Sequence, residues 1–230
     1  MHRLILFDLD GTLIRSQNGY LPFNEAIYRT FGIEGDIRTV VPDGNTDPLI
    51  VKDIFTKLAV EIEIDESAWR RFAGNLRDCY QHHLQAAAMS IRAMPGAAEL
   101  LRRLSIDEKF SASVVTGNFE WTAAVKLEAA GLALYLGRGA YASDSEYRPD
   151  LPAIAKKRFE QLAGRTIDPA QCVIVGDTPK DLEAARHNQM KCLLVGTGRY
   201  PIEELSYWRP DACLADLSDT ETVLATLAQL

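Results

Sequence analysis

The stretch LILFDLDGTL, residues 4–13, sets the fold of this chain and points to its chemistry. Its four leading apolar residues predict a short buried strand, and Asp8 and Asp10 follow where that strand gives way to a loop. Because successive side chains of a strand point to opposite faces, the two acids would share one side at a spacing of roughly 6.6 Å. Gly11 allows a tight turn, and Thr12 can hydrogen-bond the backbone or an acid to hold it. We therefore expect two carboxylates that face one site, rather than acids that merely end a strand.

Beyond this stretch, short apolar runs alternate with longer segments of helical periodicity. That order is typical of strands and helices around a parallel sheet with right-handed crossovers. The predicted fold class is α/β, with a Rossmann-like, doubly wound parallel sheet. The predicted strands are residues 3–7, 111–115, 172–175, 192–195 and 212–214, and the predicted helices are PGAAELLRRL, FEWTAAVKLEAAG, PAIAKKRFEQLA and KDLEAARHNQM.

One long segment departs from this alternation and predicts three successive helices without a convincing buried strand, at about residues 22–32, 47–60 and 66–88. We expect a core domain formed by residues 1–15 and 93–230, and a small helical cap domain formed by residues 16–92. Ligands of open parallel sheets bind at the carboxyl ends of the strands, so the cap would lie over the two acids.

Composition narrows the class of protein. The chain has 230 residues, of which 47% are hydrophobic and 25% charged, enough for one globular domain with or without an insert. A formal net charge of -7 argues against nucleic-acid or anionic-membrane partners, and the apolar runs are shorter than the roughly 18 residues of a membrane span. We expect a cytoplasmic protein. Its oligomeric state is not indicated. The four scattered cysteines predict buried reduced thiols, not a zinc site or a disulfide framework.

Two further predicted strands also end in polar residues. In SVVTGN, Thr116 follows the strand, and Gly117 and Asn118 offer backbone donors that suit an anion. Taken alone, a Thr at a strand end is more often a turn residue or a helix cap than a ligand. In VIVGDTPKDLEAA, Asp177 ends the strand and Asp181 lies four residues later at a helix start, where an acid is favoured by the helix dipole alone. Acids crowded at one sheet edge repel one another unless a cation is present, and oxygen ligands of this kind suit Mg²⁺.

These motifs together resemble the haloacid dehalogenase superfamily. FDLDGTL is similar to its first motif, VVTG to its second and GDTPKD to its fourth, and the likeness runs from end to end. The helical insert, and MPGAAELLRRL after it, resemble the phosphoglycolate phosphatase-like branch with a helical (C1-type) cap. The resemblance implies a magnesium-dependent phosphatase that hydrolyses a small phosphorylated metabolite through an aspartyl-phosphate intermediate.

The resemblance also implies roles for single residues. Asp8 would be the nucleophile, and Asp10 the acid and then the base. Magnesium would be held by the Asp8 carboxylate, the Asp10 main-chain carbonyl and the Asp177 carboxylate, with support from Asp181. The transferring phosphoryl oxygens would be bound by Thr116, Gly117 and Asn118, and Thr12 is grouped with the substrate-binding residues.

The third motif departs from the family pattern, because no KPxP-like string lies between the second and fourth motifs. The nearest match is SEYRPDLPAIAKKRF, and Arg148 is our candidate for the missing cation. A guanidinium can contact carboxylate and phosphate through two donors at once, whereas an ammonium is a compact point charge. The alternative is that Lys156 or Lys157 supplies the charge, although both lie inside a predicted helix.

The cap loop PDGNTDP, residues 42–48, resembles the Gly-x-Thr-Asp loop of relatives and makes Thr46 and Asp47 candidates for substrate binding. The alternative, which carries at least as much weight, is an ordinary polar turn in which one of them caps a helix. Two other functions stay open. A phosphosugar mutase similar to β-phosphoglucomutase keeps both acids and a helical cap, and a catalytically weakened protein could still bind a phosphorylated ligand. The presence of Asp10 counts against dehalogenase and phosphonatase activities, which by family analogy lack this acid.

Overall fold

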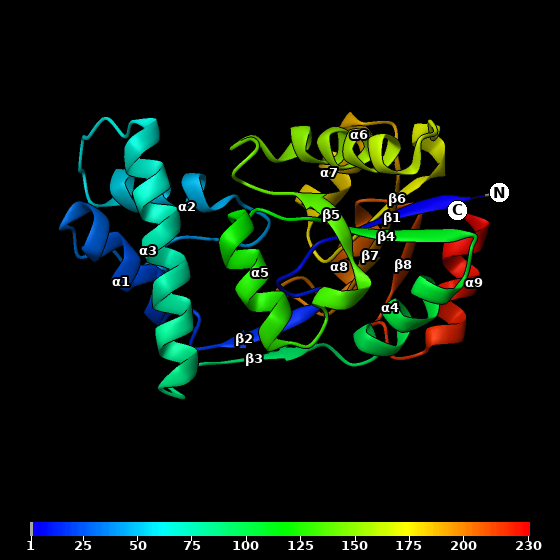
Figure 1. Cartoon of the computed structure of the whole chain (residues 1–230), viewed down its shortest axis with the longest axis horizontal. Helices are drawn as coiled ribbons and strands as arrows, with labels where there is room; N and C mark the ends of the chain where they lie inside the picture. The colour runs from blue at the N-terminus through cyan, green and yellow to red at the C-terminus, as the bar shows by residue number, and fades with distance from the viewer. Residues whose placement is uncertain (1) are drawn as a thin grey trace.

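The computed structural model describes residues 2–230 and is built around a six-stranded sheet with the strand order β5-β4-β1-β6-β7-β8 (Figure 1). Every pairing within this sheet is parallel. The strands are β1 (Arg3–Phe7), β4 (Phe110–Val115), β5 (Gly137–Ala140), β6 (Cys172–Gly176), β7 (Lys191–Val195) and β8 (Ala212–Leu214). The predicted doubly wound α/β fold is therefore confirmed.

Side-chain alternation along the strands creates two separate apolar cores, one on each face of the sheet. Leu4 and Leu6 pack on one face, against α6 (Leu151–Ala163), α7 (Pro179–His187) and α8 (Ile202–Tyr207). Ile5 and Phe7 pack on the other, against α4 (Ala97–Ile106), α5 (Glu120–Ala129) and α9 (Thr220–Gln229). Because β1 is buried on both faces, its sequence is a continuous apolar run.

Three helices lie beyond the carboxyl ends of the strands, at the left of Figure 1: α1 (Tyr20–Phe31), α2 (Asp47–Lys57) and α3 (Glu66–Gln85). Their own core is aromatic, with Phe23 edge-on to Phe72 and Phe31 edge-on to Phe55. An antiparallel pair of strands, β2 (Ile14–Gln17) and β3 (Ser90–Ala93), joins these helices to the sheet. Both predicted domain boundaries fall within this pair.

The structure contains elements that the sequence pattern does not predict. β2, β3 and β5 are short and only partly buried, so they lack an apolar run, and α8 is a helix of six residues. α9 is also outside the predicted set, as are the 3-10 turns Ile37–Thr39, Ala133–Tyr135, Arg148–Asp150 and Pro169–Gln171. α2 and α3 end three residues earlier than predicted, because Ala59 and Ala87 adopt positive φ angles of 53° and 52° just beyond them.

Burial is confirmed for three of the four cysteines, and the fourth is partly exposed. Cys79, Cys172 and Cys192 are buried and Cys213 is half-buried, and all four are free thiols. Within residues 2–230, no helix is both long and apolar enough to cross a membrane.

Candidate active site

Three neighbouring strands bring their carboxyl ends together. β1 lies between β4 and β6, and Phe7, its last residue, is level with Val114 of β4 and Val175 of β6. The chain positions that follow these strands are therefore adjacent, and they hold Asp8, Thr116 and Asp177. The sheet register thus assembles residues that lie up to 169 positions apart in the sequence.

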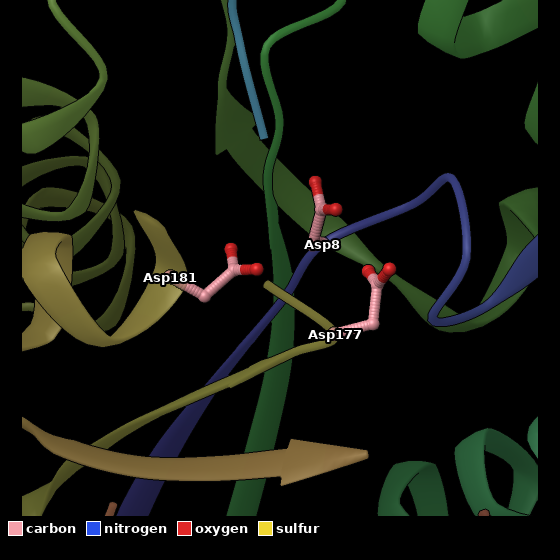
Figure 2. A group of neighbouring side chains, drawn as sticks. All are labelled: Asp8, Asp177 and Asp181. Atoms are coloured by element: carbon pink, nitrogen blue, oxygen red, sulfur yellow. The ribbon is translucent and has the colours of Figure 1, made fainter. Parts of the chain in front are cut away.

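An acidic cluster forms at this edge. Asp8, Asp177 and Asp181 each offer a carboxylate oxygen within 4.8 Å of the others, and Figure 2 shows the Asp181 carboxylate directed from its helix toward the two strand ends. All three are buried, with 5%, 2% and 1% exposure. Burial, together with repulsion between the acids, raises the pKa of Asp8 to about 7 and that of Asp177 to about 8. The cluster is therefore arranged to receive positive charge.

Arg148 supplies one such charge from a buried 3-10 turn. Its Nη2 lies 3.1 Å from Oδ1 of Asp8 and 2.5 Å from Oδ1 of Asp181. Burial alone would disfavour the guanidinium, but the two carboxylates outweigh it and raise the pKa of Arg148. Lys156 instead pairs with Glu160 of its own helix at 2.8 Å, and Lys157 is exposed. Of the cations considered from sequence, Arg148 is the one that the fold brings to the acids.

The oxygen donors of this cluster fit a divalent cation. Both oxygens of Asp181 are engaged, Oδ1 by Arg148 and Oδ2 by the backbone N–H and the hydroxyl of Thr178 at 3.0 and 2.7 Å. The Oδ2 atom of Asp177 faces Gly11 and Gly198, where an added Cβ would lie 2.4 and 1.7 Å from it. The two glycines thus let the backbone approach the Asp177 carboxylate closely, and the three acids offer oxygen ligands of the kind that Mg²⁺ prefers.

Thr12 holds the turn that follows the first motif. It is fully buried, and its hydroxyl donates to Oδ1 of Asp177 at 2.9 Å. From the sequence, Thr12 is expected to hydrogen-bond either the backbone or an acid, and here it bonds an acid. This hydrogen bond connects the loop after β1 to the end of β6. The side chain therefore fixes an acid of the cluster, while its grouping with substrate-binding residues stays a prediction.

Asp10 is the exposed member of the acid pair, with 41% of its side chain accessible. Asn118 donates from Nδ2 to Oδ2 of Asp10 at 2.8 Å and to the hydroxyl of Thr116 at 2.9 Å. The second motif and the second acid of the first motif are thus joined through one amide side chain. Asp10, Thr116, Gly117 and Asn118 all line the same cavity.

The cap loop docks on the second motif. The backbone N–H of Asp47 donates to the Gly117 carbonyl at 2.7 Å, and Oδ2 of Asp47 accepts from the Phe119 N–H at 2.8 Å. Burial raises the pKa of Asp47 to about 7, against the lowering effect of Lys126. Asp47 lines the cavity, whereas the Thr46 hydroxyl donates to the Glu146 carbonyl at 2.8 Å. Both candidate cap residues therefore make contacts with the core.

The cavity has a volume of about 380 Å³ and lies between the strand ends and the helical segment. The acids and Arg148 form one side, and Phe23, Ile37, Ile50 and Tyr80 supply an apolar side from the segment between β2 and β3. Three further basic side chains line it that sequence reasoning missed: Arg15, Lys126 and Arg199. Lys126 had a visible signal, because a lysine one turn after Thr122 and Ala123 interrupts the buried face of its helix.

Comparisons with known proteins show the family and the fold of this chain. A family model for haloacid dehalogenase-like hydrolases matches residues 2–188. The fold is similar to that of a hydrolase from Pseudomonas syringae, at 23% identity and a TM-score of 0.68, with 98% of each chain covered. It is also similar to that of a predicted phosphoglycolate phosphatase from Haemophilus somnus, at 21% identity and a TM-score of 0.68, with 97% of this chain and 98% of the other covered. A third similar structure is that of a suggested β-phosphoglucomutase from Thermotoga maritima, at 16% identity and a TM-score of 0.61, with 98% of this chain and 99% of the other covered. No curated protein matches the chain.

Proposed function

This chain belongs to the haloacid dehalogenase-like hydrolases, and on that premise we propose that it is a magnesium-dependent phosphatase of small phosphomonoesters. The observation that carries the proposal is the convergence of Asp8, Asp177 and Asp181 within 4.8 Å, with Arg148 against Asp8, at one side of a cavity of about 380 Å³. A nucleophilic carboxylate beside concentrated positive charge is what phosphoryl transfer requires.

In the first half-reaction, a carboxylate oxygen of Asp8 forms a bond to phosphorus while the bond from phosphorus to the ester oxygen breaks. Asp10 gives its proton to that leaving oxygen. Thr116 and the backbone N–H groups of Gly117 and Asn118 bind the phosphoryl oxygens, on which the charge of the transition state is spread. Arg148 orients Asp8 and neutralises part of that charge.

In the second half-reaction, a water molecule enters in place of the released alcohol. Its oxygen attacks phosphorus, its proton passes to Asp10, and the bond from phosphorus to Asp8 breaks to release inorganic phosphate. Asp8 and Asp10 are then in their starting states. One acid pair therefore supports both steps, because only Asp10 exchanges protons.

Magnesium fits the donor set of this site. We propose that the Asp8 carboxylate, the Asp10 main-chain carbonyl and the Asp177 carboxylate hold it, with Asp181 in support, since both oxygens of Asp181 are already engaged. When bound, Mg²⁺ would offset the negative charge of the cluster and of the phosphoryl group.

The cap supports a small substrate. Its side chains Phe23, Ile50 and Tyr80 lie opposite the acids, so the part of the substrate that leaves must fit between them and the strand ends. Apolar side chains opposite the acids also disfavour water there during the first half-reaction. We therefore expect a small phosphorylated metabolite rather than a phosphorylated protein or nucleic acid.

The test is a phosphate-release screen over phosphorylated metabolites, with magnesium and with a chelator, and with Asp8→Asn as the control. We expect release that needs the metal and that the substitution abolishes. Release without metal, or release that survives Asp8→Asn, would contradict the mechanism. Product analysis on hexose phosphates separates the mutase alternative, because a mutase returns the phosphoryl group to a sugar hydroxyl instead of to water.

A further inference from the structure

Lys126 is a buried cation that none of the proposed roles uses. It lies on α5, the helix that begins just after the second motif, and only 5% of the residue is exposed. Its Nζ lies 2.6 Å from Oδ2 of Asp10 and 5.1 Å from the ring centre of Tyr80, which belongs to α3. Lys126 therefore reaches the second acid from the core, with an aromatic ring of the helical segment against it.

The side-chain hydrogen bonds to the Asp10 carboxylate all go to one of its two oxygens. Lys126 Nζ and Asn118 Nδ2 both donate to Oδ2, at 2.6 and 2.8 Å. Within residues 2–230, no side chain donates a hydrogen bond to Oδ1. Two donors on one oxygen fix the rotation of a carboxylate and leave the other oxygen without a side-chain donor, in a residue that lines the cavity.

We propose that Lys126 is a positioning residue that holds the Asp10 carboxylate so that Oδ1 exchanges the proton with the leaving oxygen and then with water. This inference rests on the proposed phosphatase function. A buried ion pair is costly to desolvate, and apolar side chains of similar size often stabilise a protein as well or better. Placement at the proton-transferring acid gives the pair a use that stability alone does not.

Lys126 is itself held in place by the helix α3 and its Tyr80 side chain. α5 packs against α3, and the ring of Tyr80 offers its face to the ammonium group. Burial would lower the pKa of Lys126, but Asp10, Tyr80 and Asp47 together raise it, so the side chain stays charged. A charged donor makes a shorter and stronger hydrogen bond than a neutral one, which suits a residue that fixes an orientation.

The test compares two esters in Lys126→Met. One is the alkyl phosphate that the wild type hydrolyses fastest, whose leaving oxygen needs a proton. The other is dinitrophenyl phosphate, whose leaving group departs without one. Because Asp10 also serves the second half-reaction, the first turnover is followed by stopped flow. Lys191→Met is the matched control, since Lys191 pairs with Asp211 at 2.9 Å. Lys191 is the first residue of β7 and therefore lies at the amino ends of the parallel strands, whereas the acids lie at their carboxyl ends.

We expect Lys126→Met to slow the first turnover of the alkyl ester about 100-fold, and that of dinitrophenyl phosphate less than about 3-fold, with KM little changed. Lys191→Met should leave both rates as in the wild type. An equal loss on both esters, a rise in KM alone, or no loss on either would overturn the proposal. The first two outcomes would point to a structural role or to direct substrate contact.

A crystal structure of Lys126→Met separates this inference from the proposed function. We expect the Asp10 carboxylate to leave its wild-type orientation while Asp8 and Asp177 keep theirs. An unmoved Asp10 would overturn the positioning role even if the enzyme is a phosphatase. Failure of the wild type to hydrolyse either ester would refute the proposed function, and the orientation of Asp10 would still decide what Lys126 does.

Discussion

Asp8 and Asp10 lie two positions apart and have opposite surroundings. Asp8 is 5% exposed and lies against Arg148 within the acidic cluster. The Asp10 side chain is 41% exposed, and its partners are Asn118 and Lys126. The two environments match the two proposed roles, because a nucleophile benefits from fixed positive charge and a proton carrier must reach water.

The proposed role of Arg148 makes a prediction at this scale. Arg148→Ala removes the only side-chain cation within hydrogen-bond distance of Asp8 among residues 2–230, so we expect at least a 100-fold loss of kcat. Lys156→Ala removes a cation paired with Glu160 on α6 and should leave kcat unchanged. Steady-state phosphate release measures both. If only the lysine variant lost turnover, Lys156 would be the cation of the third motif.

Asp47 predicts a pH dependence of stability. Burial raises its pKa from 3.8 to about 7, so its neutral form is favoured in the folded state. The groups that face it are Lys126 and Asp10. Its contribution to stability is fully present below pH 3.8 and is lost as the pH rises toward 7.

Asp47→Asn removes this titration but keeps an oxygen that can accept from the Phe119 N–H. We expect the free energy of unfolding of the wild type, relative to the variant, to fall by about 4 kcal/mol at most between pH 4 and pH 7. Urea titrations at a series of pH values measure the difference. A difference that does not change with pH would contradict the raised pKa.

At the scale of elements, two loops from distant parts of the chain meet over the site. The cap loop reaches Gly117 and Phe119 through Asp47, and a Cβ added at Gly117 would lie 2.0 Å from the Asn45 carbonyl oxygen. The atom that such a Cβ would collide with belongs to the backbone of Asn45, which cannot rotate away as a side chain could. Only glycine at this position lets the cap loop close on the second motif.

Gly117→Ala should therefore displace the cap loop while the two apolar cores keep their packing. We expect kcat/KM to fall on the order of 100-fold, with a change in the thermal midpoint of only a few degrees. Gly74→Ala is the control, because its Cβ would meet nothing closer than 3.9 Å in the interior of α3, and we expect it to stabilise by about 0.5–1 kcal/mol. Equal kcat/KM in Gly117→Ala and the wild type would contradict the docked loop.

Strands such as β1 and β6 could be predicted because each is a buried apolar run that is followed by a polar residue. β2 and β3 could not, because they alternate exposed and buried side chains over only four residues each. Their pairing depends on residues more than seventy positions apart, such as Ser16 and Ile91. Local patterns carry no information about a contact of that kind.

At the scale of the whole molecule, the site is a product of sheet topology. Asp8, Thr116 and Asp177 belong to three motifs, and they meet because β1 is central and parallel to both neighbours. All three side chains stand in motifs that can be recognised in the sequence alone. Lys126 and Arg199 could not be assigned in the same way, because what brings them to the cavity is the packing of α5 and of the loop after β7.

The central claim is that Asp8 carries the phosphoryl group. The most direct measurement quenches the protein with acid during turnover of an alkyl phosphate in the presence of magnesium, and locates the phosphoryl group by peptide mass spectrometry. The account predicts a phosphoryl group on Asp8 that hydroxylamine removes, and no such group in Asp8→Asn. A phosphoryl group on another residue, or undiminished turnover in Asp8→Asn, would contradict it.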